Sequence, residues 1–227
     1  MDLVVVDWIF YCSLLTMAVS LVFLFRIYSH QPEPIKWLAA ILLFSFSCDV
    51  LARVLWLSGG NPNFPSNAYT LFSTSIITVF FLKIIGWKGL NRFYIVLNIL
   101  YIIAVGVNIF YASAGDIIPY VQVFQSLIII SLSLVFYYKL LQELPTQQLQ
   151  RMPLFWIVSG FFFSYSGKIV VFTAMNYLVT VEKDNLILAL AFHNFLSNMA
   201  NLLFVIGTQI QYKQIKSTLA TASGPHT

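Results

Sequence analysis

Seven long stretches of apolar residues alternate with short polar segments along the chain. They fall at about 4–27, 35–57, 67–85, 93–111, 117–140, 153–178 and 186–210. A helix needs roughly 20 mainly apolar residues to cross the hydrocarbon of a bilayer, and each stretch has about that length. The strands of a membrane barrel would alternate apolar and polar residues, which these stretches do not. The pattern therefore predicts an all-α bundle of seven transmembrane helices.

The composition agrees with lipid as the solvent. Of the 227 residues, 59% are hydrophobic and only 9% are charged. A soluble domain with so few charges could not cover this much apolar surface. We therefore predict a single membrane domain over 1–216, followed by a short disordered cytoplasmic tail over 217–227. The N-terminus lacks the basic region of a cleavable signal, so the first helix is expected to stay in the protein.

Lysine and arginine predict the orientation of this bundle, because nine of the twelve flank the same side of the predicted helices. They are Arg26, Lys36, Lys83, Lys88, Arg92, Lys139, Arg151, Lys213 and Lys216. Since basic loops stay in the cytoplasm, the N-terminus is predicted outside and the C-terminus inside. The sequence pI near 9.0 follows from this topology and does not indicate binding of nucleic acid.

Two parts of the chain repeat each other, since 34–49 aligns with 153–168 without a gap. Both begin with Pro-x-x-Trp and both contain a Phe-Ser-aromatic-Ser run, at 44–47 and at 163–166. We predict a parallel repeat in which helices 1–3 and helices 5–7 are related by an axis along the membrane normal. Helix 4 joins the two copies.

The repeat places Asp49 and Lys168 at equivalent positions, and so at the same depth in the outer half of the membrane. Ionisable side chains in a membrane usually face the bundle interior and find a partner there. We therefore expect Asp49 to face Lys168, with Arg53 one turn closer to the outside. Two simpler interpretations stay open. Asp49 and Arg53 are four residues apart and could pair on one helix surface, and Arg53 could reach the outer interface.

Further polar residues are predicted in the same outer layer. They are Asn67 on the third helix, Gln122 and Gln125 on the fifth, Tyr165 on the sixth, and His193, Asn194 and Asn198 on the seventh. With the three charged residues they form the candidate ligand site, a polar chamber that opens to the outside above a drier cytoplasmic half. The alternative for any single asparagine is a hydrogen bond that only holds neighbouring helices together.

Motifs for enzymatic chemistry are missing. Of the three histidines, His30 and His226 lie in a loop and in the tail, so a multi-histidine metal site or a pair of haem ligands is not available. No phosphate-binding glycine loop or serine-nucleophile elbow occurs. Cys12 and Cys48 lie within predicted spans and are interpreted as small apolar residues. We expect no catalytic activity, no metal and no cofactor.

The predicted layout resembles two families of three-plus-one-plus-three membrane proteins. In rhodopsins, the lysine that binds retinal lies on the last helix, which here has none in its span, so retinal on Lys168 is not expected. In PQ-loop carriers, substrate binds between two three-helix bundles. Their Pro-Gln signature is not reproduced by "QPEP" in the first loop.

The stretches "PLFWIVSGFFFSYSGKIVVF" and "HNFLSNMANLLFVIG" resemble a group of small seven-helix bacterial membrane proteins. Most are uncharacterised, and they are suspected of acting in signalling beside histidine kinases. The matching residues are Pro153, Trp156, the Ser-Gly pair at 166–167 and the His-Asn pair at 193–194. Small polar residues are more common than lysine at the position of Lys168 in that group. The resemblance implies the architecture and a bacterial inner membrane, and gives no chemistry.

These observations lead to a hypothesis of an inner-membrane sensor or receptor. It would bind a small polar or amphiphilic ligand in the outer-half chamber and signal through a separate cytoplasmic or membrane protein. The main alternative is a small-solute carrier that uses the same chamber as a midway site. A structural or assembly subunit is the third interpretation.

Overall fold

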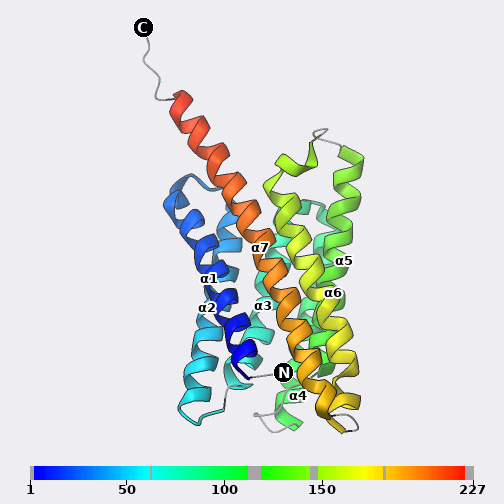
Figure 1. The fold of residues 1–227 in the computed structure, drawn as a ribbon. Coiled ribbons are helices and arrows are strands. Elements are labelled where there is room, and N and C mark those ends of the chain that lie inside the picture. Colours follow the sequence, from blue (N-terminus) through cyan, green and yellow to red (C-terminus); the bar gives the residue numbers. More distant parts are fainter. Residues whose placement is uncertain (1–2, 62, 112–118, 144–147, 181–182, 223–227) are drawn as a thin grey trace.

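The computed structural model consists mainly of α-helices that run alternately up and down, with the start of α1 and the end of α7 at opposite ends of the bundle (Figure 1). It describes residues 3–61, 63–111, 119–143, 148–180 and 183–222, and within these ranges no β-strand occurs. The helices are α1 (Leu3–Arg26), α2 (Glu33–Leu57), α3 (Asn63–Ile85), α4 (Lys88–Tyr111), α5 (Pro119–Glu143), α6 (Pro153–Thr180) and α7 (Lys183–Ala222). The predicted all-helical fold is confirmed, and each predicted apolar stretch corresponds to one helix.

Five of the helices contain segments that are long and apolar enough to cross a bilayer. These segments lie in α1, α2, α3, α5 and α6, while α4 has a shorter apolar stretch, Asn91–Val107. The outer surface of the bundle is apolar as well, with side chains such as Leu15, Leu141 and Val170 more than 60% exposed. So much exposed apolar surface is typical of a protein that is solvated by lipid.

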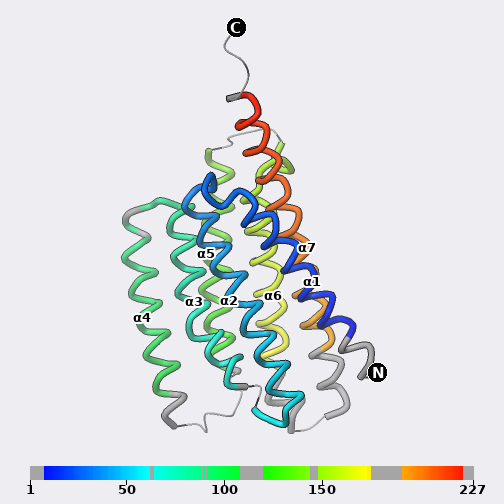
Figure 2. The backbone as a smooth tube through the Cα atoms, turned by 90° about the vertical axis from the view of Figure 1, so that its left-hand side faces the viewer, coloured from blue at the N-terminus to red at the C-terminus, as the bar shows by residue number. Residues whose placement is uncertain are grey.

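Six of the helices form a closed ring. α1 packs on α2, α2 on α3, α3 on α5, α5 on α6 and α6 on α7, and α7 packs back on α1. α4 lies outside this ring, where it contacts only α3 and α5 among its main packing partners (Figure 2). The ring therefore consists of two consecutive three-helix groups, and the helix between them in sequence is peripheral.

α4 attaches to the ring through one stripe of residues that are polar at their tips. Tyr94, Asn98 and Tyr101 are buried at a spacing of four and three residues, which keeps them on one helix face. The Asn98 amide donates to Thr78 Oγ1 at 3.1 Å and its oxygen accepts from Ser75 Oγ at 2.9 Å. Hydrogen bonds of this kind hold helices together where lipid removes the hydrophobic driving force between them.

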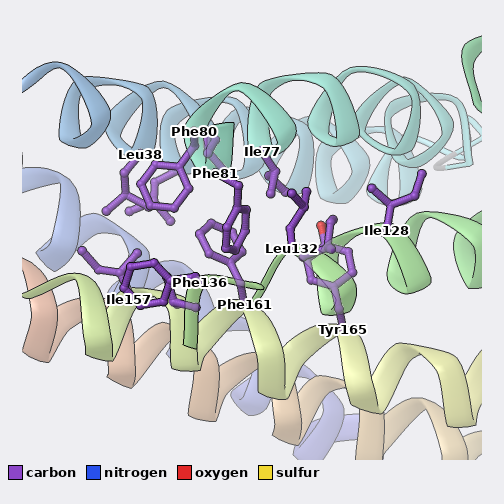
Figure 3. Packing of buried hydrophobic residues seen from close by; sticks show 14 of the residues in the cluster. Leu38, Ile77, Phe80, Phe81, Ile128, Leu132, Phe136, Ile157, Phe161 and Tyr165 are labelled. Carbon is purple, nitrogen blue, oxygen red and sulfur yellow. The ribbon is translucent and has the colours of Figure 1, made fainter. Parts of the chain in front are cut away.

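The apolar core extends along the bundle, from Val121 near the start of α5 to Leu24, Ile85 and Leu140 at the end where α1, α3 and α5 finish. Toward that end, four phenylalanine rings from α3, α6 and α7 meet. Figure 3 labels Phe80, Phe81 and Phe161 among them. The ring of Phe161 lies 4.9 Å from that of Phe204, 5.7 Å from Phe80 and 5.8 Å from Phe81, measured between centroids. We call these four residues the phenylalanine block. Aromatic rings at such separations pack as a dense, water-excluding layer.

A sharp connection at the same end joins α3 to α4. Gly86 adopts a positive φ of 72°, a backbone conformation that favours glycine, and its N–H donates to Leu82 O at 3.0 Å to end α3. The ammonium of Lys139, on α5, donates to Ile85 O at 2.7 Å and to Ile84 O at 3.3 Å. A cation at a helix C-terminus satisfies the last carbonyl groups and interacts favourably with the helix dipole.

Glycines bring α6 and α7 into close contact. A Cβ atom on Gly160 would lie 2.7 Å from a ring carbon of Phe204, and one on Gly207 would lie 2.7 Å from Cγ1 of Ile157. A Cβ on Gly167 would collide with the side chain of α7 that packs there. Small residues at helix contacts allow close approach of the backbones in membrane proteins. α6 and α7 are thus the most closely packed pair of the bundle.

α7 is 40 residues long and extends past the other helices at its C-terminal end (Figure 1). The prediction of a disordered tail from 217 is wrong for residues 217–222, which continue the helix. The hydroxyls of Ser217 and Thr218 donate to a carbonyl of the preceding turn at 2.7 and 3.0 Å, so these polar residues fit the helix. Residues 223–227 lie outside the described ranges.

Candidate ligand-binding site

A cavity of about 300 Å³ lies inside the helix ring, next to the phenylalanine block on the side away from the end where α1, α3 and α5 finish. Each of the six ring helices contributes to its lining. Eight of the ten residues that the sequence singled out line it. They are Asp49, Gln122, Gln125, Tyr165, Lys168, His193, Asn194 and Asn198. Residues that are up to 149 positions apart in sequence are therefore brought to one enclosed space.

Arg53 and Asn67 do not line the cavity. The Arg53 guanidinium lies beside aromatic rings, with its Cζ 4.5 Å from the ring centroid of Trp56 and 5.6 Å from that of Phe10. Phe10 is itself a lining residue, so Arg53 lies just behind the wall, one helical turn from Asp49. On α3, the neighbouring residue Ser66 lines the cavity, whereas Asn67 does not.

Asp49 and Lys168 line the same cavity from α2 and α6 and are close enough to interact electrostatically. Within the described residues, however, no ion pair within 4.0 Å joins them, so the expected direct contact is not formed. The Lys168 ammonium lies instead over two tyrosine rings, 4.3 Å from the centroid of Tyr165 and 5.6 Å from that of Tyr69. The Lys168 ammonium therefore makes cation–π contacts where a direct ion pair with Asp49 was expected.

Amide side chains on the cavity wall also join the two three-helix groups. At the contact of α3 with α5, Gln125 Nε2 donates to Ser73 Oγ at 2.8 Å. At the contact of α7 with α1, Asn198 Nδ2 donates to Ile9 O at 3.1 Å and Asn201 Nδ2 donates to a serine hydroxyl at 2.9 Å. These amides therefore connect neighbouring helices and also line the cavity, so the two interpretations do not exclude each other.

Three lining residues each have a buried polar atom with no hydrogen-bond partner among the described residues. The atoms are the Tyr165 hydroxyl, His193 Nδ1 and Asn198 Oδ1. A buried polar group without a partner destabilises a fold by about 1–3 kcal/mol. Such groups are rare in native structures, and a cluster around one cavity is typical of a functional site more than of a packed interior.

The wall of the cavity toward the phenylalanine block is apolar. Phe161 and Phe204 belong both to the block and to the lining, beside Met17, Ile41 and Leu42. The polar residues gather on the other side. The cavity thus has an apolar floor, which separates it from the basic end of the bundle, and a polar wall on the side away from that end.

Some lining residues were not predicted from the sequence, in particular Ser45, Cys48 and Ser164. The repeat contains a signal for two of them, because Ser45 and Ser164 occupy equivalent positions in the aligned segments. Leu42 and Phe161 are another equivalent pair, and both line the cavity. Equivalent positions on α2 and α6 therefore face the same space.

The cavity offers both signs of charge, several amides and hydroxyls, and an aromatic wall. Such a lining can bind and orient a small polar molecule. Among the described residues, no group of three or more His, Cys, Asp or Glu side chains is placed to hold a metal ion. No protein-family model, curated protein or solved structure matches the chain. The chemistry of the cavity is therefore the guide to function.

Proposed function

We propose that the protein is a seven-span integral membrane receptor of a bacterial inner membrane, with its N-terminus outside. It binds a small polar ligand in the central cavity and transmits the change to a separate signalling protein. The observation that carries this proposal is the central cavity, which is lined from all six ring helices, holds Asp49, Lys168 and several amides, and is closed toward the basic end by the phenylalanine block.

The distribution of basic residues supports the orientation. Arg26, Lys36, Lys83, Lys139 and Arg151 all lie at the end of the bundle where α1, α3 and α5 end and α2 and α6 begin. The positive-inside rule assigns this end to the cytoplasm. The polar cavity then lies in the outer half, where a ligand arrives without crossing the membrane.

The arrangement of the ring supports an internal repeat. A two-fold axis along the membrane normal would relate α1, α2 and α3 to α5, α6 and α7, and would exchange the α3–α5 contact with the α7–α1 contact. Both of these contacts contain amide hydrogen bonds. Asp49 and Lys168 would be related by the same axis, in agreement with their place on opposite helices of one cavity.

α6 and α7 are the natural path for a signal. Phe161 on α6 and Phe204 on α7 touch each other beneath the cavity, and the glycine contacts keep the two helices together. α7 continues without interruption from His193 at the cavity to Ala222 beyond the bundle. A ligand that moves the lining of α6 and α7 therefore also moves the protruding end of α7.

A small-solute carrier is the second candidate, because hydrogen-bonded contacts between two three-helix groups would suit halves that rock about a central site. A carrier must expose the cavity to both sides in turn, whereas a receptor need not. The phenylalanine block favours the receptor, since opening toward the basic end would have to separate four interlocked rings.

Cysteine accessibility tests this choice. In a chain with Cys12→Ser and Cys48→Ser, the Ser45→Cys and Ser164→Cys variants place one thiol on each half of the cavity. We expect a membrane-impermeant thiol reagent to label both variants in intact cells and neither in inside-out vesicles. Labelling from both sides would favour the carrier, and labelling from neither side would contradict a ligand chamber that opens outward.

A further inference from the structure

The cavity presents one carboxylate and one ammonium that do not satisfy each other. Asp49 and Lys168 both line it, and within the described part of the chain neither makes a hydrogen bond or an ion pair. The tyrosine rings beside Lys168 stabilise its charge but accept none of its hydrogen bonds in the geometry seen, where the ammonium lies over the ring faces. Three N–H donors and the carboxylate oxygens are therefore left for other groups.

The size of the cavity limits what can fill it. A volume of about 300 Å³ equals about ten water molecules at roughly 30 Å³ each. It is at the lower end of the range for small-molecule sites. A ligand of about ten non-hydrogen atoms or fewer fits, whereas a lipid-like or long polyene molecule does not.

The two opposite charges determine which small molecules fit best. A small anion would pair with Lys168 and leave Asp49 without an ionic partner, and a small cation would do the reverse. A neutral molecule would leave both charges unpaired. A buried charge without a partner is strongly unfavourable, so each of these ligands carries a penalty that a doubly charged ligand avoids.

We infer that the ligand is a compact zwitterion, such as an α-amino acid or a small betaine. Its carboxylate pairs with Lys168 and its ammonium pairs with Asp49. The apolar floor, with Phe161 and Phe204, accepts an uncharged side chain, and the amide of Gln122 or Asn194 is available to the remaining polar atoms. This inference rests on the proposed function, because it names the class of ligand for the same cavity.

Binding to the wild-type protein in lipid nanodiscs tests the inference directly. The probes are glycine, L-alanine, L-leucine and glycine betaine, with acetate, propionate, isobutylamine and acetamide as matched compounds of single or no charge. Calorimetric titration and the shift in Tm are the readouts. We expect at least one zwitterion to bind ten times more tightly than the acid, amine and amide of similar size.

Substitution of the two charged residues then assigns each end of the ligand. The Asp49→Asn variant is expected to lose at least tenfold in affinity for the zwitterion and to gain preference for the matched carboxylic acid. The Lys168→Gln variant is expected to gain preference for the matched amine. Opposite changes in preference distinguish binding contacts from a general loss of structure, which would reduce the affinity for every probe.

The exposed ion pair at the basic end supplies matched controls. Glu33 and Lys83 are joined at 2.8 Å, with 61% and 44% of their side chains exposed. The Glu33→Gln and Lys83→Gln variants change the net charge as the cavity variants do but should keep the affinity and the preference of the wild type.

Two results would overturn the inference. In the first, a singly charged or neutral probe binds as tightly as its zwitterionic counterpart, and the cavity is then a ligand site of another class. In the second, no probe binds to the wild type. Cysteine labelling of the cavity is independent of both results, so the receptor proposal stands or fails separately.

Discussion

Polar side chains around Lys168 have two roles at once. Asn198 and Gln125 hold neighbouring helices together through one polar atom, and they also belong to the cavity wall. Tyr165 supports the Lys168 ammonium with its ring, while its buried hydroxyl has no hydrogen-bond partner among the described residues. At this scale, stability and binding compete for the same atoms, as is typical of functional sites.

Two buried tyrosines allow a matched test of this competition. The hydroxyl of Tyr101 donates to Thr70 O at 2.8 Å, whereas that of Tyr165 has no hydrogen-bond partner in the described part of the chain. We expect Tyr101→Phe to lower the free energy of unfolding by about 1 kcal/mol and Tyr165→Phe to leave it unchanged or raise it. Reversible unfolding of the purified protein in mixed micelles measures both. Equal losses in the two variants would contradict an unpartnered hydroxyl at Tyr165.

Eight of the ten residues predicted from the sequence line the cavity, but the arrangement of the charged ones was not predicted. Depth follows from residue counting along a helix, and the repeat placed Asp49 and Lys168 at one level. Whether two long side chains touch depends on rotamers, and these depend on the rings packed around them. The same reason explains Arg53, which lies against Trp56 on its own helix and not in the cavity.

At the scale of helices, the apolar pattern indicated seven elements and their approximate ends. It could not show which face of each helix is buried, because lipid-facing and core-facing positions are both apolar in a membrane protein. The stripe of Tyr94, Asn98 and Tyr101 on α4 was missed for this reason, although polar residues four and three apart in an apolar helix were a signal. The helical end of α7 was missed because its residues are polar, and polarity alone does not exclude a helix.

The contact between α6 and α7 leads to a prediction about glycine. A Cβ on Gly207 would lie 2.7 Å from a side-chain carbon of Ile157 and 2.9 Å from the backbone oxygen of Pro153, which cannot easily move. We expect Gly207→Ala to destabilise the protein by about 1–3 kcal/mol through overpacking.

Gly106 on α4 is the matched control, since a Cβ there meets nothing within 4 Å. Replacing it with alanine should be neutral or stabilise the helix by up to about 1 kcal/mol. Thermal unfolding of both variants beside the wild type gives the comparison. A Gly207→Ala variant as stable as the Gly106→Ala variant would mean that α6 and α7 are not in close contact in solution.

The whole molecule is a ring of two three-helix groups with a seventh helix outside. Sequence similarity between the groups suggested the pairing of α2 with α6, and these two helices do contribute equivalent positions to one cavity. The closure of the ring and the peripheral place of α4 could not be predicted, because they depend on side-chain packing between helices that are distant in sequence.

The proposed topology predicts which ends of the helices face each side of the membrane. In a background without native cysteines, Ser58→Cys and Tyr120→Cys should react with an impermeant thiol reagent in intact cells. Ser29→Cys and Gly89→Cys should react only in inside-out vesicles. Ser58 and Ser29 lie just beyond opposite ends of α2. Gly89 lies near the start of α4 and Tyr120 near the start of α5, and these two helix starts are at opposite ends of the bundle. Labelling of all four from one side would contradict a bundle that spans the bilayer.

The length of α7 and its contact at Gly207 give the helix the proportions of a lever. Asn198, on the cavity wall, lies nine residues before this contact, and Ala222 lies fifteen residues after it. At 1.5 Å per residue these arms measure about 14 and 22 Å. If α6 and α7 tilt together about this contact, which lies near the start of α6, a displacement at the cavity is enlarged about one and a half times at the free end of α7. Mechanical gain of this kind needs no hinge and no unfolding, only a rigid rod and a fulcrum.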